Sequence, residues 1–254
     1  MGVLGLEKTG LSVIKAVQQA GGLLICWDDN KLKRDNLKVD GVTVRDLNDK
    51  KIIRELDLLV VSPGVPHLYP KAHPIVTLAY ELNIRVDNDI GLFFSNHVQE
   101  EYEAFGDPPK IIAITGSNGK STATALTNHV LSKFFSDVEM GGNIGKPVLE
   151  LSPLKEGSIR IIELSSYQIE LAKCLAPNLA AFINFSPDHL QRHGGLGGYF
   201  YAKARLFLEN LTDVSVINID TAEGLFLFQR LNTVENKMIA VPYTHLTLPT
   251  MELV

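Results

Sequence analysis

The stretch Lys110-Ile-Ile-Ala-Ile-Thr-Gly-Ser-Asn-Gly-Lys-Ser-Thr122 decides the fold. A run of mostly β-branched apolar residues precedes a glycine loop that ends in Gly-Lys-Ser, and an amphipathic helical pattern follows. Gly116 and Gly119 allow backbone N–H groups to face phosphate oxygens, and the start of a helix adds partial positive charge. The stretch therefore predicts a strand, a loop that binds a nucleoside triphosphate, and a helix.

The side chains of this loop have the chemistry that a triphosphate requires. Lys120 would reach the β and γ phosphates, and the Ser121 hydroxyl would coordinate Mg²⁺. Ile114 stands where the first glycine of the standard G-x-x-x-x-G-K-[ST] pattern belongs, so a shortened loop remains. A chance Gly-Lys-Ser triplet is the alternative, and the flanking strand and helix patterns argue against it. The predicted phosphate-binding residues are Gly116, Ser117, Asn118, Gly119, Lys120, Ser121 and Thr122.

Short apolar runs alternate with helical patterns along the chain, which is typical of an α/β fold with parallel sheets. The predicted strands are a truncated one at the N-terminus, then Gly22–Trp27, Leu56–Val61, Lys110–Thr115, Ile159–Glu163, Leu179–Phe185 and Val214–Ile219. Apolar helix faces are expected at Leu11, Ile14 and Val17, and at Leu126, Val130 and Phe134. Paired prolines at 108 and 109 suit a linker, so we expect two units, residues 1–106 and 107–254.

Composition excludes several classes of protein. The chain has 254 residues, of which 45% are hydrophobic, with 24 basic and 29 acidic side chains and a net charge of −5. A predominantly disordered chain is excluded, and the acidic balance argues against nucleic acid as a partner. No apolar run approaches the roughly 18 residues of a membrane span. Cys26 and Cys174 lack metal-ligand spacing, so we expect packing residues in a reduced, cytoplasmic compartment.

A second glycine loop, Gly5-Leu-Glu-Lys-Thr-Gly10, precedes the first helical pattern. Dinucleotide-binding loops carry glycine at the first, third and sixth positions, but here Glu7 occupies the third, where its charge would oppose a diphosphate. Asp28, at the end of the next predicted strand, is suitably placed for a ribose contact. Nucleotide binding and a simple tight turn therefore both remain open for this loop. An NAD-dependent oxidoreductase ranks far lower, because Glu7 would have to tolerate a pyrophosphate.

Two further residues are expected near the phosphate loop. Glu163 ends one predicted strand, and His189 lies just past another. Because the carboxyl ends of parallel strands form the ligand crevice, Lys120, Ser121, Glu163 and His189 are expected to line one site. The carboxylate and the imidazole could bind Mg²⁺ or orient phosphates. Taken singly, each has an ordinary alternative, a solvated strand end for Glu163 and a loop histidine for His189.

Several spaced motifs together resemble the Mur ligase family, the ATP-dependent amide-bond ligases of peptidoglycan precursor synthesis. They are Thr115-Gly-Ser-Asn-Gly-Lys-Ser-Thr122, Gly141-Gly-Asn-Ile-Gly145, Glu163-Leu-Ser-Ser-Tyr-Gln168, Asp188-His-Leu-Gln-Arg-His193, Tyr201-Ala-Lys-Ala-Arg205 and Ser62-Pro-Gly-Val65. The Glu-Leu-Ser-Ser-aromatic-Gln pattern resembles the members that add D-glutamate. Glu7, Asn88 and Gly91 depart from the residues usual in those members.

The resemblance implies a Rossmann-like domain at 1–106 that binds the UDP substrate, followed by an incomplete P-loop ATPase-type α/β domain at 107–254. It implies addition of D-glutamate to UDP-N-acetylmuramoyl-L-alanine through an acyl phosphate. We expect a monomer with small-molecule substrates and, from the composition, neither a nucleic-acid nor a membrane partner. The implied catalytic residues are Lys120, His189 and Lys203. Two Mg²⁺ ions are implied, one held by Ser121 and Glu163, the other by His189 and a carbamylated Lys203. Implied substrate contacts are Thr9, Asp28, Asn143, Ser165 and Gln168.

The chain is shorter than the resemblance requires. A C-terminal Rossmann-like domain that closes on ATP has no counterpart in it, and residues 243–254 match nothing in the family pattern. We therefore also consider a catalytically inactive fragment that binds substrate or nucleotide. Without the resemblance, Lys203 would be interpreted as a helix-surface lysine.

Overall fold

The computed structural model describes residues 1–99, 105–209, 212–231 and 237–242. The first unit is built on five strands: β1 (Gly2–Leu4), β2 (Leu24–Trp27), β3 (Val42–Val44), β4 (Leu58–Val61) and β5 (Arg85–Asp87). Its helices are α1 (Lys8–Gln19), α2 (Lys31–Asp35), α3 (Lys50–Ile53) and α4 (Pro74–Glu81). All strand pairs are parallel, in the order β3-β2-β1-β4-β5. This order matches the first five strands of the six-stranded Rossmann order 3-2-1-4-5-6.

The second unit contains a sheet of six parallel strands in the order β11-β10-β9-β6-β8-β7. They are β6 (Lys110–Thr115), β7 (Val138–Gly142), β8 (Ile159–Glu163), β9 (Leu179–Phe182), β10 (Val214–Asn218) and β11 (Lys237–Val241). The helices are α6 (Lys120–Leu131), α7 (Ser166–Leu171), α8 (Leu196–Leu208) and α9 (Ala222–Leu231), with 3₁₀ turns η1 (Val148–Glu150) and η2 (Leu190–Arg192).

The winding of the second sheet places its crevice at β6. From β6 the chain crosses to the edge strand β7, returns to β8, and then passes to the other side of β6 to form β9, β10 and β11. In open α/β sheets, ligands bind beyond the carboxyl ends of the strands where the winding direction reverses. The predicted phosphate loop, which follows β6, lies at this point of the sheet.

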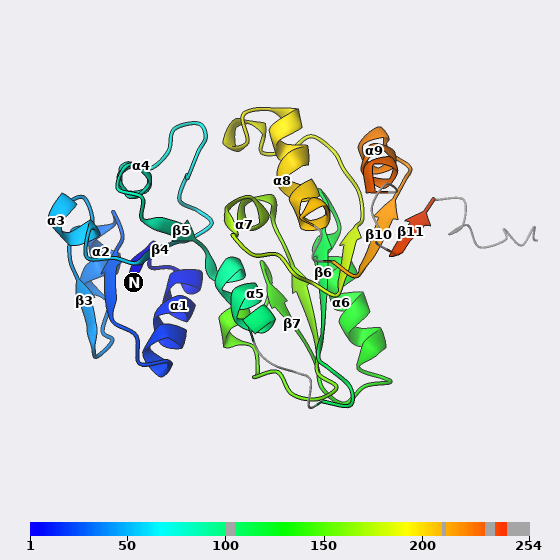
Figure 1. The fold of residues 1–254 in the computed structure, drawn as a ribbon, viewed down its shortest axis with the longest axis horizontal. Helices are drawn as coiled ribbons and strands as arrows, with labels where there is room; N and C mark the ends of the chain where they lie inside the picture. Colours follow the sequence, from blue (N-terminus) through cyan, green and yellow to red (C-terminus); the bar gives the residue numbers. More distant parts are fainter. Residues whose placement is uncertain (100–104, 210–211, 232–236, 243–254) are drawn as a thin grey trace, which may run out of the picture.

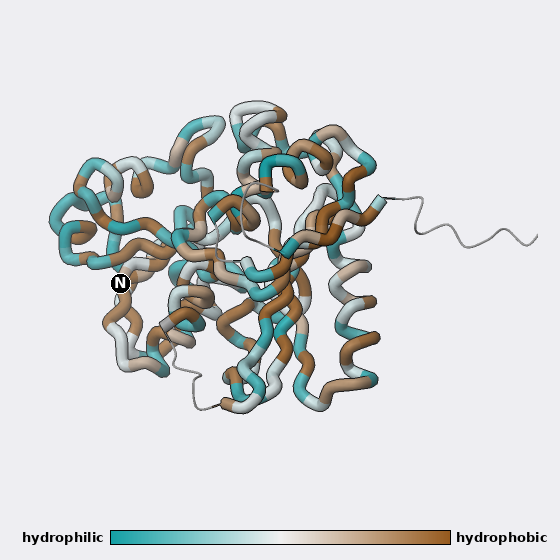
Figure 2. Tube along the Cα trace, turned by 45° about the vertical axis from the view of Figure 1, so that its right-hand side comes forward, coloured by the Kyte–Doolittle hydropathy of each residue, from teal (hydrophilic) through white to brown (hydrophobic). Residues whose placement is uncertain are grey.

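Two apolar cores of unequal size cover the two faces of the second sheet. The larger lies under α5, α7, α8 and α9 and contains Phe94, Phe182 and Phe207, while the smaller lies under α6 around Ile114 and Ile161. The strands form the apolar centre of the molecule, and most loops are hydrophilic (Figure 2). Since parallel sheets are normally covered on both faces, this layering agrees with the parallel pairing.

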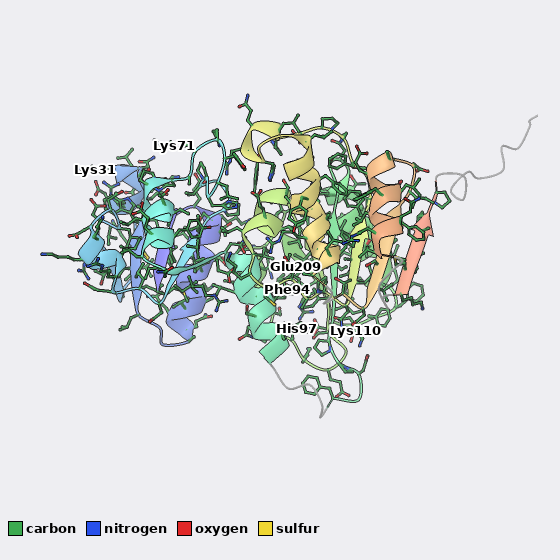
Figure 3. The ribbon with its side chains drawn as sticks, turned by 45° about the horizontal axis from the view of Figure 1, so that its top comes forward. Lys31, Lys71, Phe94, His97, Lys110 and Glu209 are labelled. Atoms are coloured by element: carbon green, nitrogen blue, oxygen red, sulfur yellow. The ribbon has the colours of Figure 1, made fainter. Side chains whose placement is uncertain are left out.

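Helix α5 (Asp89–Gln99) joins the two units (Figure 1). It lies between the two sheets, where Figure 3 labels Phe94 and His97 on it. Ile90 and Phe94 belong to the core of the second sheet, whereas Leu92 packs against a core of the first. Asn88, which departs from the family pattern, lies just before α5 and donates from Nδ2 to the carbonyl oxygen of Gln168, 2.7 Å away. The units are therefore connected by packing and by buried polar contacts.

The α/β class and the predicted strands are confirmed, with shifts of a few residues at some ends. The short, polar or glycine-containing strands β3, β5 and β7 lacked a clear apolar run and were not predicted, and neither was β11. Segments 100–104 and 243–254, which include part of the expected linker and the unmatched tail, lie outside the described residues. Among the described residues, the structure contains no helix with the length and apolarity required to cross a membrane.

The expected helix faces were wrong in part. Leu126 and Val130 are 61% and 45% exposed, because α6 turns Thr124 and Leu131 toward the sheet instead. Phe134 lies beyond the end of α6 and is 78% exposed. The phosphate loop fixes where α6 begins. The loop, and not the apolar stripe of the helix, therefore determines which side of α6 faces the sheet. In α1 the buried apolar side chains are Val13 and Ile14, of which Ile14 was expected, while Leu11 is exposed.

Candidate functional site

The loop after β6 has the conformation of a phosphate cradle. Gly119 immediately precedes α6 and has a φ of 72°, in the left-handed region that favours glycine. No side chain caps the start of α6, so its first N–H groups remain available to a ligand. Lys120 lies in the first turn and donates from Nζ to the carbonyl oxygen of Ser117, 2.9 Å away. The cation is therefore folded back over the loop, where it can reach a phosphate.

Two residues not found by sequence reasoning hold this loop in place. The Oδ1 atom of Asn184 accepts hydrogen bonds from the backbone N–H groups of Ser117 and Asn118, at 3.0 and 2.9 Å. Ser117 is buried, and its hydroxyl donates to the carbonyl oxygen of Ser186 at 2.8 Å and lies 3.1 Å from the Tyr199 hydroxyl. Asn184 and Ser186 follow β9, so their position at a strand's carboxyl end was the available signal.

Lys203 is buried beside the same loop. Its side chain projects from α8, and Nζ donates to the carbonyl oxygen of Gly116 at 2.7 Å and lies 4.7 Å from the centre of the Tyr199 ring. Burial, followed by the positive charge of Lys120, lowers the pKa of Lys203 to about 7, and Asp188 opposes that shift. A substantial fraction of the amine is therefore neutral near pH 7. Lys203 is buried, so the interpretation as a helix-surface lysine is wrong.

Glu163 ends β8 next to the loop and is 1% exposed. Its Oε1 atom accepts a hydrogen bond from Asn143 Nδ2 at 2.8 Å, while Oε2 is buried and has no hydrogen-bond partner among the described residues. Thr115, the last residue before the loop, donates from its hydroxyl to the carbonyl oxygen of Leu164 at 3.0 Å. An unpartnered buried carboxylate oxygen fits a bound cation, because burying it alone is unfavourable.

His189 is less closely integrated. It adopts a left-handed backbone conformation, with φ of 51°, and its ring lies 5.1 Å from that of Tyr167 and 3.3 Å from the Asp188 carboxylate. Within the described ranges, no three His, Cys, Asp or Glu side chains gather closely enough to hold a metal by protein atoms alone. Any Mg²⁺ here would therefore need oxygen atoms from nucleotide, water or a modified lysine.

Ser165 and Gln168 form a capping box at the start of α7. The Ser165 hydroxyl accepts from the Gln168 backbone N–H at 3.3 Å, and Gln168 Oε1 accepts from the Ser165 N–H at 3.0 Å. Their polar groups thus fix the helix that follows Glu163. Gln168 also lines a cavity between the units, whereas Ser165 does not.

Two neighbouring cavities, each of about 300 Å³, form the candidate substrate site. The first lies within the first unit, and Asp28 and His73 are part of its wall. The second lies between the units and is lined by residues of both, including Thr9, Asn143 and Gln168. Both cavities are lined by Glu7, Ser62 and Gly64, so they adjoin.

The charge of Glu7 is paired in this site. Lys33 Nζ lies 2.6 Å from Glu7 Oε1 and 3.6 Å from Asp28 Oδ2, so one cation faces two carboxylates. Asp28 also accepts from the backbone N–H of Leu6 at 2.8 Å, which fixes it at the end of β2. The unfavourable charge that the sequence placed in this loop is therefore offset by Lys33.

Comparisons with known proteins identify the family of this chain. Residues 114–245 match the model of the Mur ligase middle domain, a match that includes the first three residues of the segment 243–254. A UDP-N-acetylmuramoylalanine–D-glutamate ligase of Ruegeria pomeroyi is 49% identical over 225 residues, which cover 89% of this chain and 48% of the relative. A protein of the same name from Dinoroseobacter shibae is 46% identical over 230 residues, covering 91% of this chain and 50% of the relative.

Solved structures of similar shape include a UDP-N-acetylmuramate-alanine ligase of Thermotoga maritima, with 18% identity and a TM-score of 0.48, covering 89% of this chain and 50% of that one. The chain spans about half the length of the curated relatives it matches. Because the family model matches more than half of the chain, from just before the phosphate loop to beyond β11, the chain belongs to the Mur ligase family.

Proposed function

We propose that this chain forms the substrate-binding and ATP-binding part of a ligase that adds D-glutamate to UDP-N-acetylmuramoyl-L-alanine. The first unit, residues 1–106, would bind the UDP end of the substrate, and the second, from residue 107, would bind ATP. One observation supports this most strongly. The cavity between the units is lined by Asn143, whose side chain bonds Glu163 beside the phosphate loop. A carboxylate presented through that cavity would meet the triphosphate.

In the proposed reaction, a carboxylate oxygen of the alanyl group attacks the γ phosphorus of ATP, and ADP leaves. The neutral amine of D-glutamate then attacks the acyl carbon, and the tetrahedral intermediate collapses to the amide as inorganic phosphate leaves and the nitrogen releases a proton to solvent. Negative charge builds on the phosphoryl oxygens, so the protein contributes positioning and electrostatic neutralisation. Lys120 supplies a mobile cation, and the start of α6 supplies free N–H groups.

Two observations indicate that the residues present could hold Mg²⁺. The orphaned Oε2 of Glu163, with the Ser121 hydroxyl, would hold one ion. The neutral amine of Lys203 can react with CO₂ to form a carbamate, which would act with His189 as an oxygen and nitrogen donor for a second. When bound, Mg²⁺ neutralises phosphate charge. An ammonium at Lys203 would repel it.

The second candidate function is binding of these substrates without turnover. It is favoured by the two adjoining cavities and the uncapped start of α6, which would support binding whether or not the amide bond forms. Both functions use the same site and differ only in whether the amide bond forms.

Phosphate release separates the two. The protein is incubated with ATP, Mg²⁺ and UDP-N-acetylmuramoyl-L-alanine, with D-glutamate or with L-glutamate as control. Ligase activity predicts phosphate release that depends on D-glutamate. Saturable calorimetric binding of the UDP substrate without release supports the second function. Absence of both binding and release would contradict the proposal.

A further inference from the structure

A loop of the first unit, residues 62–73, reaches across to the second unit. Its His67 places Nε2 3.3 Å from Oε2 of Glu170 on α7. Arg192 of η2 donates to the carbonyl oxygen of Gly64 at 3.4 Å. These contacts join residues more than 100 positions apart in the chain. None of them belongs to the phosphate loop or to the proposed metal ligands.

Glu170 lies at the centre of a buried polar chain. Its Oε1 atom is 3.1 Å from Nδ1 of His193, whose Nε2 is 2.9 Å from the hydroxyl of Ser166. His67, His193 and Ser166 are 6%, 2% and 2% exposed. We call His67, Glu170, His193 and Ser166 the interface network. Oε1 of Glu170 is paired with His193, whereas Oε2 and His67 Nε2 lie 3.3 Å apart in an electrostatic contact that lacks hydrogen-bond geometry. Removing either side chain leaves the facing polar atom without this contact, which is unfavourable for a group shielded from water.

Close packing reinforces the network. Gly194, with φ of 67°, approaches the ring of Tyr69 so closely that an added Cβ would lie 2.9 Å from a ring carbon. The ring of Tyr167 stacks on that of His193 with centroids 5.1 Å apart. The loop of the first unit therefore docks on a shaped surface made by α7 and the segment after η2.

The loop and the helix that form this contact also contribute residues to the walls of the substrate cavities. On the first unit, Ser62 and Gly64 line both cavities and belong to the same loop as His67. On the second unit, Gln168 lines the cavity between the units, two residues before Glu170 on α7. The interface network thus lies next to both the wall of the first cavity and the wall beside the phosphate loop.

We propose that His67 and Glu170 are positioning residues, which hold the two units at the separation that a ligand bridging the cavities requires. This inference rests on the proposed function, since it takes UDP-N-acetylmuramoyl-L-alanine as the bridging ligand. Ligands that contact one unit alone do not depend on the network. UDP would occupy the first cavity, which only residues of the first unit line, and a Mg²⁺-bound ATP analogue would occupy the phosphate loop.

Calorimetric titration with three ligands tests this inference. UDP, the Mg²⁺ complex of a non-hydrolysable ATP analogue and UDP-N-acetylmuramoyl-L-alanine are titrated into the parent chain, His67→Ala, Glu170→Gln and the double variant. We expect each single variant to lose about 10-fold in affinity for the bridging ligand and less than 2-fold for the others. The double variant should lose little more than either single one, because both break the same contact.

Glu55→Gln is the matched control, since it removes an exposed ion pair with Arg45 of 2.7 Å within the first unit. It should leave all three affinities unchanged. His67→Ala keeps the experiment decisive if Glu170→Gln fails to fold, because His67 lies on a loop. Thermal unfolding verifies that each variant is folded.

The outcomes separate the two levels of the proposal. Unchanged affinity for the bridging ligand in folded variants overturns the positioning role and leaves the proposed function intact. An equal loss for all three ligands also overturns it, since that pattern indicates general loss of structure. A parent chain that binds UDP but not UDP-N-acetylmuramoyl-L-alanine contradicts the proposed function, and the inference falls with it.

Discussion

Lys203 on α8 donates a hydrogen bond from Nζ to the carbonyl oxygen of Gly116, 2.7 Å away, and so joins a buried lysine to the first residue of the phosphate loop. The bond places an amine with a lowered pKa beside the loop that would carry the triphosphate. A lysine in this environment is a candidate for chemistry as well as for packing.

We predict that Lys203 forms a carbamate. The neutral amine reacts with CO₂, and because the pKa of Lys203 is about 7, the neutral fraction rises through pH 7. Carbon-13 NMR of protein equilibrated with labelled bicarbonate should show a carbamate signal that is stronger at pH 8 than at pH 6. Lys203→Arg keeps a cation but cannot react in this way, so its spectrum should lack the signal. An equal signal in that variant would show that another amine reacts.

The unpartnered oxygen of Glu163 predicts opposite effects on stability and on metal binding. Glu163→Gln removes a buried charge, so the metal-free variant should gain about 1 kcal/mol in free energy of unfolding. Its affinity for Mn²⁺, used as a paramagnetic substitute for Mg²⁺, should fall about 10-fold in the presence of an ATP analogue. Urea unfolding and electron paramagnetic resonance measure the two effects. Glu150→Gln, at an exposed acid in η1, is the control, and Mn²⁺ affinity equal to that of this control would exclude Glu163 as a ligand.

Asp89 predicts how stability depends on pH. Burial raises the pKa of its carboxyl to about 7, so the folded protein retains a proton that the unfolded chain releases near pH 4. This contribution to stability is complete below about pH 4 and is lost as the pH rises to about 7, on the order of 4 kcal/mol in all.

Asp89→Asn stays neutral at every pH and should remove that loss. Relative to the parent chain, the variant should gain stability between pH 5 and pH 8 in urea unfolding and match it at pH 4. Parallel stability curves for the two proteins across this range would show that the Asp89 carboxyl does not retain its proton in the folded state.

Local sequence was sufficient to locate the phosphate loop and its neighbouring elements. Between Lys110 and Thr122, the strand, the loop and the start of the helix are each determined by nearby residues, and the structure has all three. Glu163 at a strand end was predicted for the same reason. Parallel strands bring such ends to one edge regardless of the details of packing.

Contacts between distant segments could not be predicted in this way. The support of the loop by Asn184 spans more than 60 residues, and the pairing of His67 with Glu170 spans more than 100. Both depend on how loops dock, which no periodic pattern encodes. The orientation of α6 was missed for a related reason, because an apolar stripe indicates an amphipathic helix but not which neighbour covers it.

The proposed function requires that the loop after β6 binds the triphosphate. The direct test is calorimetric titration of the Mg²⁺-bound ATP analogue into the parent chain, Lys120→Ala and the control Lys133→Ala, at an exposed lysine of the second unit. Charge-assisted hydrogen bonds to phosphate contribute about 1.5 to 3 kcal/mol, so Lys120→Ala should weaken binding by about 10- to 150-fold while Lys133→Ala binds like the parent. Equal affinity for the parent and Lys120→Ala would contradict the assignment of this loop.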